Sequence, residues 1–180
     1  GNWTRDWANQ LKKNHRIIEE VEEYRDALYR PFTRLRSYFA DDLNQERYQL
    51  TRLFPTKESD NIAMCITTTG ERKDFAVLMS DKIVDLHLFS DGSQCFPLYY
   101  YEESKKLNPT LFDGNGQPEY IRRDGISDFI LERARSQYGN NVGKEDICYY
   151  VYGFLHSPEY RETFANDLKK MLPRLPLAED

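Results

Sequence analysis

The stretch YYVYGFLHSPEYR, residues 149–161, decides how the last third of this chain folds. The apolar residues before His156 recur at helical spacing, which predicts a helix over 144–155. Ser157 and Pro158 then form a favourable helix start, because serine caps free backbone N–H groups and proline needs no donor at the first helical position. A further helix is predicted over 127–138, beginning at Ser127 and ending before Gly139. Helical spacing places Phe129, Ile130 and Ala134 on the inward face of this helix. In the helix after Ser157, it places Tyr160, Phe164 and Leu168 on one face.

The middle of the chain has the period of β-strands. Over residues 61–68, Ile62, Met64 and Ile66 alternate with smaller side chains, which predicts a strand. Further strands are expected at 33–39, 83–89 and 95–101, and Pro97 indicates an edge or a bulge in the last of them. Residues 75–79 are expected to form another strand or a short helix. A helical segment is expected over 1–14, a helical turn or two over 22–28, and loops over 41–59 and 107–120. This layout predicts an α+β fold, with a central mixed or antiparallel sheet followed by a C-terminal helical cluster.

Size and composition allow one domain, or one and a half. The chain has 180 residues, and its 10 Phe, 13 Tyr and 2 Trp bury enough apolar area for a packed core despite a hydrophobic share of 39%. It opens in the middle of an amphipathic pattern, so we expect a segment excised from a larger protein. We predict three parts: a junction over 1–40, a β-rich part over 41–120 and a helical part over 121–180.

The sequence lacks the patterns of several function classes. It contains no phosphate-binding loop and no zinc-protease motif, and its three histidines are too scattered to build a catalytic set by spacing. Its three cysteines, Cys65, Cys95 and Cys148, form no CxxC pair, so we expect buried free thiols in a reducing cytoplasm. No run approaches the roughly 18 apolar residues of a membrane span. We therefore expect no catalytic residue, metal or cofactor in this chain, and no membrane partner.

Charge is the remaining signal. The formal net charge of −5 argues against a general nucleic-acid coat, but the field that matters in binding is local. Residues 24–39 hold four arginines against one aspartate. On a strand, Arg34 and Arg36 share a face, where two guanidinium groups can grip phosphates or a guanine edge. The alternative is that Arg30 and Arg34 pair with nearby acids and fix the fold.

Several phrases in a fixed order resemble one family. They are ALYRPFT at 27–33, RLFP at 52–55, DLHLF at 85–89 followed by SQCFPLY at 93–99, and YGFLHSP at 152–158 with the tail that follows. In this order the chain resembles, over nearly its whole length, the C-terminal region of bacterial single-chain restriction-modification enzymes of type ISP, often called predicted helicases.

That resemblance implies a function outside catalysis. The full enzymes combine a nuclease, an ATP-driven translocase, an N6-adenine methyltransferase and a target-recognition domain. They use S-adenosylmethionine, ATP and Mg in the cytoplasm. The matched segment follows the methyltransferase motifs and lacks all catalytic ones, so it implies a non-enzymatic target-recognition fragment. Its expected partners are double-stranded DNA and the upstream methyltransferase and motor domains.

Two functional hypotheses follow. In the first, the chain reads DNA, the target adenine is flipped into the neighbouring methyltransferase, and the contacts come from these residues: Arg30, Arg34, Arg36, Arg72, Lys73 and Gln94. In the second, the aromatic helices over 127–172 form a coupling module that docks the methyltransferase and motor domains.

Overall fold

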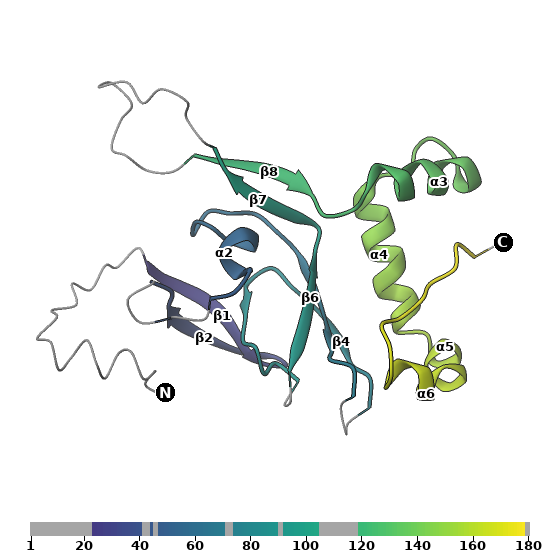
Figure 1. The fold of residues 1–180 in the computed structure, drawn as a ribbon, viewed down its shortest axis with the longest axis horizontal. Helices are drawn as coiled ribbons and strands as arrows, with labels where there is room; N and C mark the ends of the chain where they lie inside the picture. Colours follow the sequence, from purple (N-terminus) through teal and green to yellow (C-terminus); the bar gives the residue numbers. More distant parts are fainter. Residues whose placement is uncertain are drawn as a thin grey trace, which may run out of the picture.

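The computed structural model describes residues 23–40, 44, 47–70, 74–89, 92–104 and 119–178. Figure 1 shows strands gathered at the centre of the molecule and helices beside them at the C-terminal end, so the predicted α+β class is confirmed. The predicted central sheet is three small sheets within the described residues. The predicted helix over 1–14 lies outside the described residues, as does most of the predicted loop over 107–120.

The first sheet has the strand order β2-β1-β5. β1 (Tyr24–Arg30) pairs antiparallel with β2 (Thr33–Tyr38) and parallel with β5 (Ile83–Val84). The predicted helical turn over 22–28 is therefore wrong for the part that β1 occupies. Ala27 and Leu28 are neighbours that pack into two different apolar clusters, which is how a central strand covered on both faces behaves. Such a strand loses the alternation that would have marked it.

The second sheet has the order β4-β3-β6, and all pairs are antiparallel. β3 (Ala63–Thr67) is buried throughout and confirms the predicted strand, and β4 (Val77–Ser80) lies on one side of it. β6 (Ser93–Pro97) is an edge strand, which its proline allows because proline cannot donate to a neighbour. Leu28 and Val84 of the first sheet pack against β3, so the two sheets share one core.

Two predicted strands are shorter than expected. Over 83–89, pairing ends at Val84, because Asp85 closes a turn: its side chain accepts the His87 N–H at 2.8 Å and its carbonyl accepts the Leu88 N–H at 3.0 Å. The predicted strand over 95–101 breaks at Leu98 into β6 and β7, which belong to different sheets.

The third sheet is the hairpin of β7 (Tyr99–Glu103) and β8 (Tyr120–Asp124), and β8 was not predicted. The buried amide of Asn61 fixes where β7 begins. Its Nδ2 donates to the carbonyls of Leu53 at 2.9 Å and Tyr99 at 2.7 Å, and its Oδ1 accepts the Tyr99 N–H at 3.0 Å. After β8, the Gly125 N–H donates to the Leu98 carbonyl at 2.7 Å. A side chain at Gly125 would collide with the carbonyl of Pro97, so only glycine fits there.

The helices form where the sequence indicated. α3 (Asp128–Tyr138) and α5 (Pro158–Thr163) start at Ser127 and Ser157, whose hydroxyls accept the third-residue N–H of each helix. α4 (Lys144–Leu155) runs between them, and α6 (Ala165–Leu168) follows a break at Phe164. The described residues of the predicted loop over 41–59 include a short helix, α2 (Leu50–Leu53).

α4, α5 and α6 cover one face of β3 and β4. The shared cluster contains these buried residues: Met64, Ile66, Phe75, Val77, Leu155, Tyr160 and Leu168. Burial of each large apolar side chain contributes roughly 1.5–3 kcal/mol, so this cluster holds the helices to the sheet. α3 lies beyond that contact, and of its predicted inward residues only Ala134 is buried; Phe129 is 68% exposed and Ile130 37% exposed. Phe164, predicted on one face with Tyr160 and Leu168, is 43% exposed, whereas the other two are buried.

Among the helices that the structure describes, none combines the length and the apolar character that crossing a bilayer requires.

Candidate nucleic-acid interface

The β1–β2 hairpin presents two arginines on one exposed face, as predicted. Arg34 and Arg36 are two positions apart on β2, lie opposite Leu28 and Asp26 of β1, and are both exposed. The side chain between them, Leu35, points to the opposite face. The guanidinium of Arg36 lies 5.5 Å from the ring centre of Tyr24, which steadies it by a cation–π contact.

Two cavities that share Asp81 and Lys82 border this hairpin, and together we call them the basic groove. The first has a volume of about 490 Å³ and is lined by Tyr24, Arg25, Asp26, Arg36, Phe54, Thr56, Lys57, Ser59, Asp81, Lys82 and Ile83. The second has a volume of about 300 Å³ and is lined by Leu28, Phe32, Arg34, Leu78, Met79, Ser80, Asp81 and Lys82.

The basic groove carries more positive than negative charge. Five cationic side chains line it, namely Arg25, Arg34, Arg36, Lys57 and Lys82, against the carboxylates of Asp26 and Asp81. Asp81 is engaged by its neighbour, because Lys82 Nζ lies 3.0 Å from its Oδ2. Lys82 lines both cavities and joins them. In a chain with a net charge of −5, this local excess of cations gives a surface suited to bind an anionic polymer.

Phe32 stands at the end of the groove, in the turn between β1 and β2. Its ring is 88% exposed and its backbone has φ 64°. That left-handed conformation is unfavourable for a side chain of this size. The turn therefore displays an aromatic ring to solvent at a cavity that Arg34 also lines.

Arg30 has protein partners. Its Nη1 donates to the Tyr29 carbonyl at 2.7 Å and to Asp85 Oδ1 at 3.1 Å, and its guanidinium lies 4.0 Å from the Tyr29 ring centre. This matches the alternative that Arg30 ties the hairpin to the turn after β5. The Arg30–Asp85 pair is nearly 40% exposed on both sides, so it contributes little stability and leaves the arginine near the surface. A DNA contact by Arg30 stays a prediction.

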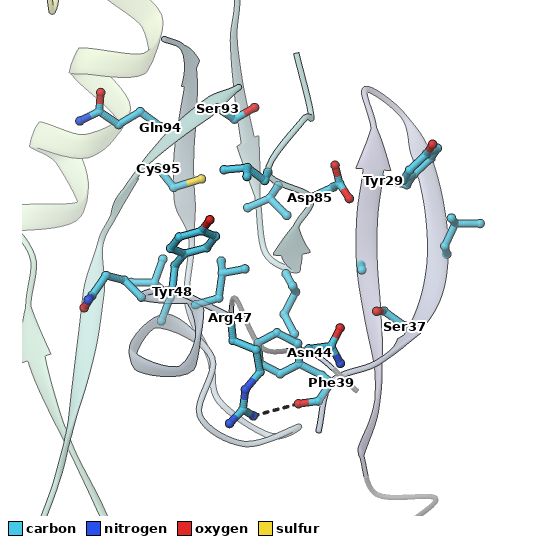
Figure 2. A pocket seen from close by; sticks show the side chains of 18 residues that line it. Tyr29, Ser37, Phe39, Asn44, Arg47, Tyr48, Asp85, Ser93, Gln94 and Cys95 are labelled. Atoms are coloured by element: carbon cyan, nitrogen blue, oxygen red, sulfur yellow. Dashed lines mark hydrogen bonds between the residues drawn. The ribbon is translucent and has the colours of Figure 1, made fainter. Parts of the chain in front are cut away.

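Of the remaining predicted residues, the structure describes Gln94, which does not line the basic groove. Arg72 and Lys73 lie outside the described residues. Gln94 is exposed on β6 and borders a different cavity, of about 500 Å³, between the hairpin, α2, β5 and β6. Figure 2 shows the Gln94 amide pointing away from that cavity, whereas the sulfur of Cys95 points into it.

The cavity beside Cys95 is held together by main-chain contacts. Arg47 Nη1 donates to the Phe39 carbonyl at 2.9 Å, the bond drawn in Figure 2, and Asn44 Nδ2 donates to the Ala40 carbonyl at 3.1 Å. Two of the polar side chains that line it thus bond to the surrounding backbone. Across those residues, no three His, Cys, Asp or Glu side chains converge in a group that could hold a metal ion.

Sequence reasoning missed Arg25, Lys57 and Lys82. Arg25 lies on β1, and the mistaken helical prediction for 22–28 hid its place in a strand. Lys57 and Lys82 lie in connections, and no sequence signal shows that these connections meet at one groove.

Comparison with known proteins identifies the class. The profile of the Type ISP C-terminal specificity domain matches residues 1–180, so the chain belongs to that family. This is the specificity domain of Type ISP restriction-modification enzymes, as the resemblance implied. No curated protein matches the chain.

Three solved structures share the fold over 99% of the chain. One is the ATP-dependent Type ISP restriction-modification enzyme LlaBIII bound to DNA, with 29% identity and a TM-score of 0.78. Another is a DrdV–DNA complex, with 30% identity and a TM-score of 0.81. The third is a nuclease-deletion mutant of the Type ISP enzyme LlaGI with a DNA substrate mimic, with 31% identity and a TM-score of 0.72. The chain spans 11%, 16% and 14% of those chains, respectively.

Proposed function

We propose that this chain recognises the DNA target of a larger restriction-modification enzyme and that the basic groove grips the DNA backbone. The observation that carries the proposal is the match of the whole chain to a specificity domain, together with likeness to three enzymes whose structures contain DNA or a DNA mimic. Within the fold, the groove supplies the local positive surface that backbone binding needs.

In this proposal, the catalytic parts of the larger enzyme lie outside this chain. The larger enzyme carries helicase, nuclease and N6-adenine methyltransferase parts, acts in the cytoplasm, and uses ATP, Mg and S-adenosylmethionine outside this chain. Residues 1–40 form the junction with the methyltransferase, 41–120 the recognition part and 121–180 the helical part. Support comes from the small share of each related chain that the fold occupies and from the ATP dependence stated for LlaBIII.

The residues divide by role. Arg34 and Arg36 contact phosphates, because both are exposed on one face of the groove. Arg30, at the surface beside the Phe32 turn, approaches the same strand of DNA. Gln94, together with Arg72 and Lys73, is assigned to base reading, since amide and guanidinium side chains pair with base edges in the major groove.

Substitution in the complete enzyme tests the groove. Changing Arg34 and Arg36 together to Gln should weaken binding to all DNA sequences alike and make the salt dependence of log K less steep by about 1.8, since each lost phosphate contact removes about 0.9. Arg133→Gln on α3 is the control, because it removes an exposed arginine outside the groove. Unchanged affinity and salt dependence in the double variant would reject the groove as the DNA surface.

Exchange of the recognition part tests target reading itself. Residues 60–120 would be replaced by those of a relative with a different target, and methylated adenines would then be mapped across a genome. A new methylated sequence supports reading by this chain. Loss of activity with the old sequence retained supports the second candidate below.

The second candidate is a coupling module, and exposed aromatic side chains favour it. Phe129 on α3 is 68% exposed and Tyr149 on α4 is 50% exposed. Tyr150 and Tyr152 are half-buried, and Tyr150 instead binds the C-terminal tail through its hydroxyl, 2.9 Å from the Pro176 carbonyl. The helices are tied to the third sheet by Lys144, whose Nζ lies 2.7 Å from Asp124 and 2.6 Å from Asp128. A domain docked on α3 and α4 would therefore act on a well-anchored element.

A further inference from the structure

Arg25 is a buried cation whose charge the described part of the chain leaves poorly compensated. Its side chain is 11% exposed, and its Nε and Nη1 are buried without a hydrogen-bond partner. The one carboxylate that the described residues bring within 4.0 Å is that of Glu23, which lies 3.9 Å from Nη2 and is too distant for a hydrogen bond. Burial of an unpaired charge is among the least favourable arrangements in a protein, so an external anion bound to Arg25 would be stabilising.

The surroundings of Arg25 suit an anion. It lines the larger cavity of the basic groove together with Arg36 from β2, Lys57 from the connection after α2, and Lys82 from the turn between β4 and β5. Three separate segments thus bring further cations to the same space. The opposing acids are Asp26 and Asp81 in the lining and Glu23 beside Arg25. Asp81 pairs with Lys82, so these two charges cancel, and Arg25, Arg36 and Lys57 remain against Asp26 and Glu23, which leaves the cavity with one positive charge in excess.

The cavity continues beyond the reach of one small ion. Lys82 also lines the smaller cavity. Arg34 of β2 lines that cavity, as Arg36 of β2 lines the larger one. A repeating anion with several exposed oxygens per unit, such as a DNA backbone, matches two adjacent cationic cavities better than a single carboxylate does.

We propose that the cavity beside Arg25 receives a phosphate of the DNA backbone, and that this phosphate neutralises Arg25. The inference rests on the proposed function and adds to it a specific anion site. In the absence of DNA, the buried and unpaired guanidinium of Arg25 lowers the free energy of unfolding. On binding, the phosphate supplies the compensating charge. The free energy that the unpaired Arg25 charge costs in the folded protein is then regained and adds to the DNA affinity.

This assignment predicts opposite signs for stability and binding. Replacement of Arg25 by Met keeps the length of the side chain and removes the charge. In the full chain without DNA, Arg25→Met should raise the midpoint of urea unfolding. In the complete enzyme, the same change should weaken binding to duplex DNA and make the slope of log K against log salt less steep by about 0.9, the value of one phosphate contact. Arg25→Lys, which keeps the charge, should retain most of that slope.

The control is Arg133→Met, which removes an exposed arginine on α3 and should change neither measurement. The proposal is overturned if Arg25→Met lowers the unfolding midpoint, because the arginine would then be paired with an acid of the protein. It is equally overturned if the slope stays the same. Failure of the proposed function has a different signature, namely that the unaltered enzyme methylates no defined DNA sequence.

Discussion

Cys65 and Cys95 face each other across adjacent strands, with their Sγ atoms 2.9 Å apart. Cys65 is fully buried in β3, whereas Cys95 is half-buried in β6 and lines the cavity shown in Figure 2. The hydrogen bond between the two sulfurs stabilises a thiolate on Cys95 and so lowers the pKa of Cys95, although burial opposes the effect. The same bond, with burial, raises the pKa of Cys65.

This relationship predicts selective alkylation. Iodoacetamide at neutral pH should modify Cys95 first, because the thiolate is the reactive form and this sulfur borders a cavity. Cys65 is shielded, and burial raises the pKa of Cys148, so both should react only after unfolding. Peptide mass spectrometry over time checks the order. In Cys95→Ser, rapid modification should disappear; rapid labelling of Cys148 would contradict the prediction.

Asn61 is predicted to be a major determinant of stability. Its amide joins the end of α2 to the start of β7, and its side chain is 2% exposed. Asn61→Leu would leave the Leu53 and Tyr99 groups buried without partners, so the free energy of unfolding should fall by about 3 kcal/mol. Urea unfolding followed by circular dichroism measures this. Asn141→Leu, at an exposed position after α3, should change it by less than about 0.5 kcal/mol.

Phe32 offers a test of backbone strain. Since its φ is 64° and its ring is 88% exposed, Phe32→Asn should raise the free energy of unfolding by about 1 kcal/mol, because asparagine tolerates the left-handed conformation. Phe32→Ala removes the ring and keeps the strain, so it should have little effect. A loss of stability in the Asn variant, measured by urea unfolding, would show that the ring packs against the protein.

Lys144 should make stability depend on acid. A hydrogen bond and the charge of Lys144 hold the pKa of Asp128 below its usual range. The pKa of Lys144 is raised in turn by its bonds to Asp124 and Asp128. A depressed carboxyl pKa stabilises the fold above the unfolded value of about 3.9, and this stabilisation is lost as pH falls below it. The raised lysine pKa stabilises below about 10.4 and is lost as pH rises past it.

In Lys144→Met, the decline of the free energy of unfolding below about pH 4 should therefore be smaller than in the unaltered chain. Urea titrations at several pH values between neutrality and acid check this. Lys170→Met, in the exposed region after α6, is the control and should retain the full decline. An identical decline in the Lys144 variant would rule out the ion pairs as its source.

Helix caps and strand alternation, which are local signals in the sequence, predicted several helices and strands correctly. Ser127 and Ser157 marked two helix starts, and the alternation around Met64 marked β3. β1 was missed because Ala27 and Leu28 are both buried, and tertiary burial on two faces removes the period of a strand. Phe129 was placed inside because spacing shows that a face is apolar, but not whether another element covers it.

Only part of the candidate site could be predicted from the sequence. The shared face of Arg34 and Arg36 follows from strand geometry and is confirmed. The burial of Arg25 without a hydrogen-bonded partner depends on what surrounds it in space, as does the meeting of Lys57 and Lys82 at one groove. Neither can be predicted from spacing along the chain.

Gly125 has a mechanical consequence. Only a hydrogen fits beside the Pro97 carbonyl where the chain leaves the third sheet, and Lys144 links the end of β8 to the start of α3 through Asp124 and Asp128. A displacement of α3 would then move β7 and β8 with it. Any larger side chain at position 125 would loosen that transmission while leaving the basic groove intact.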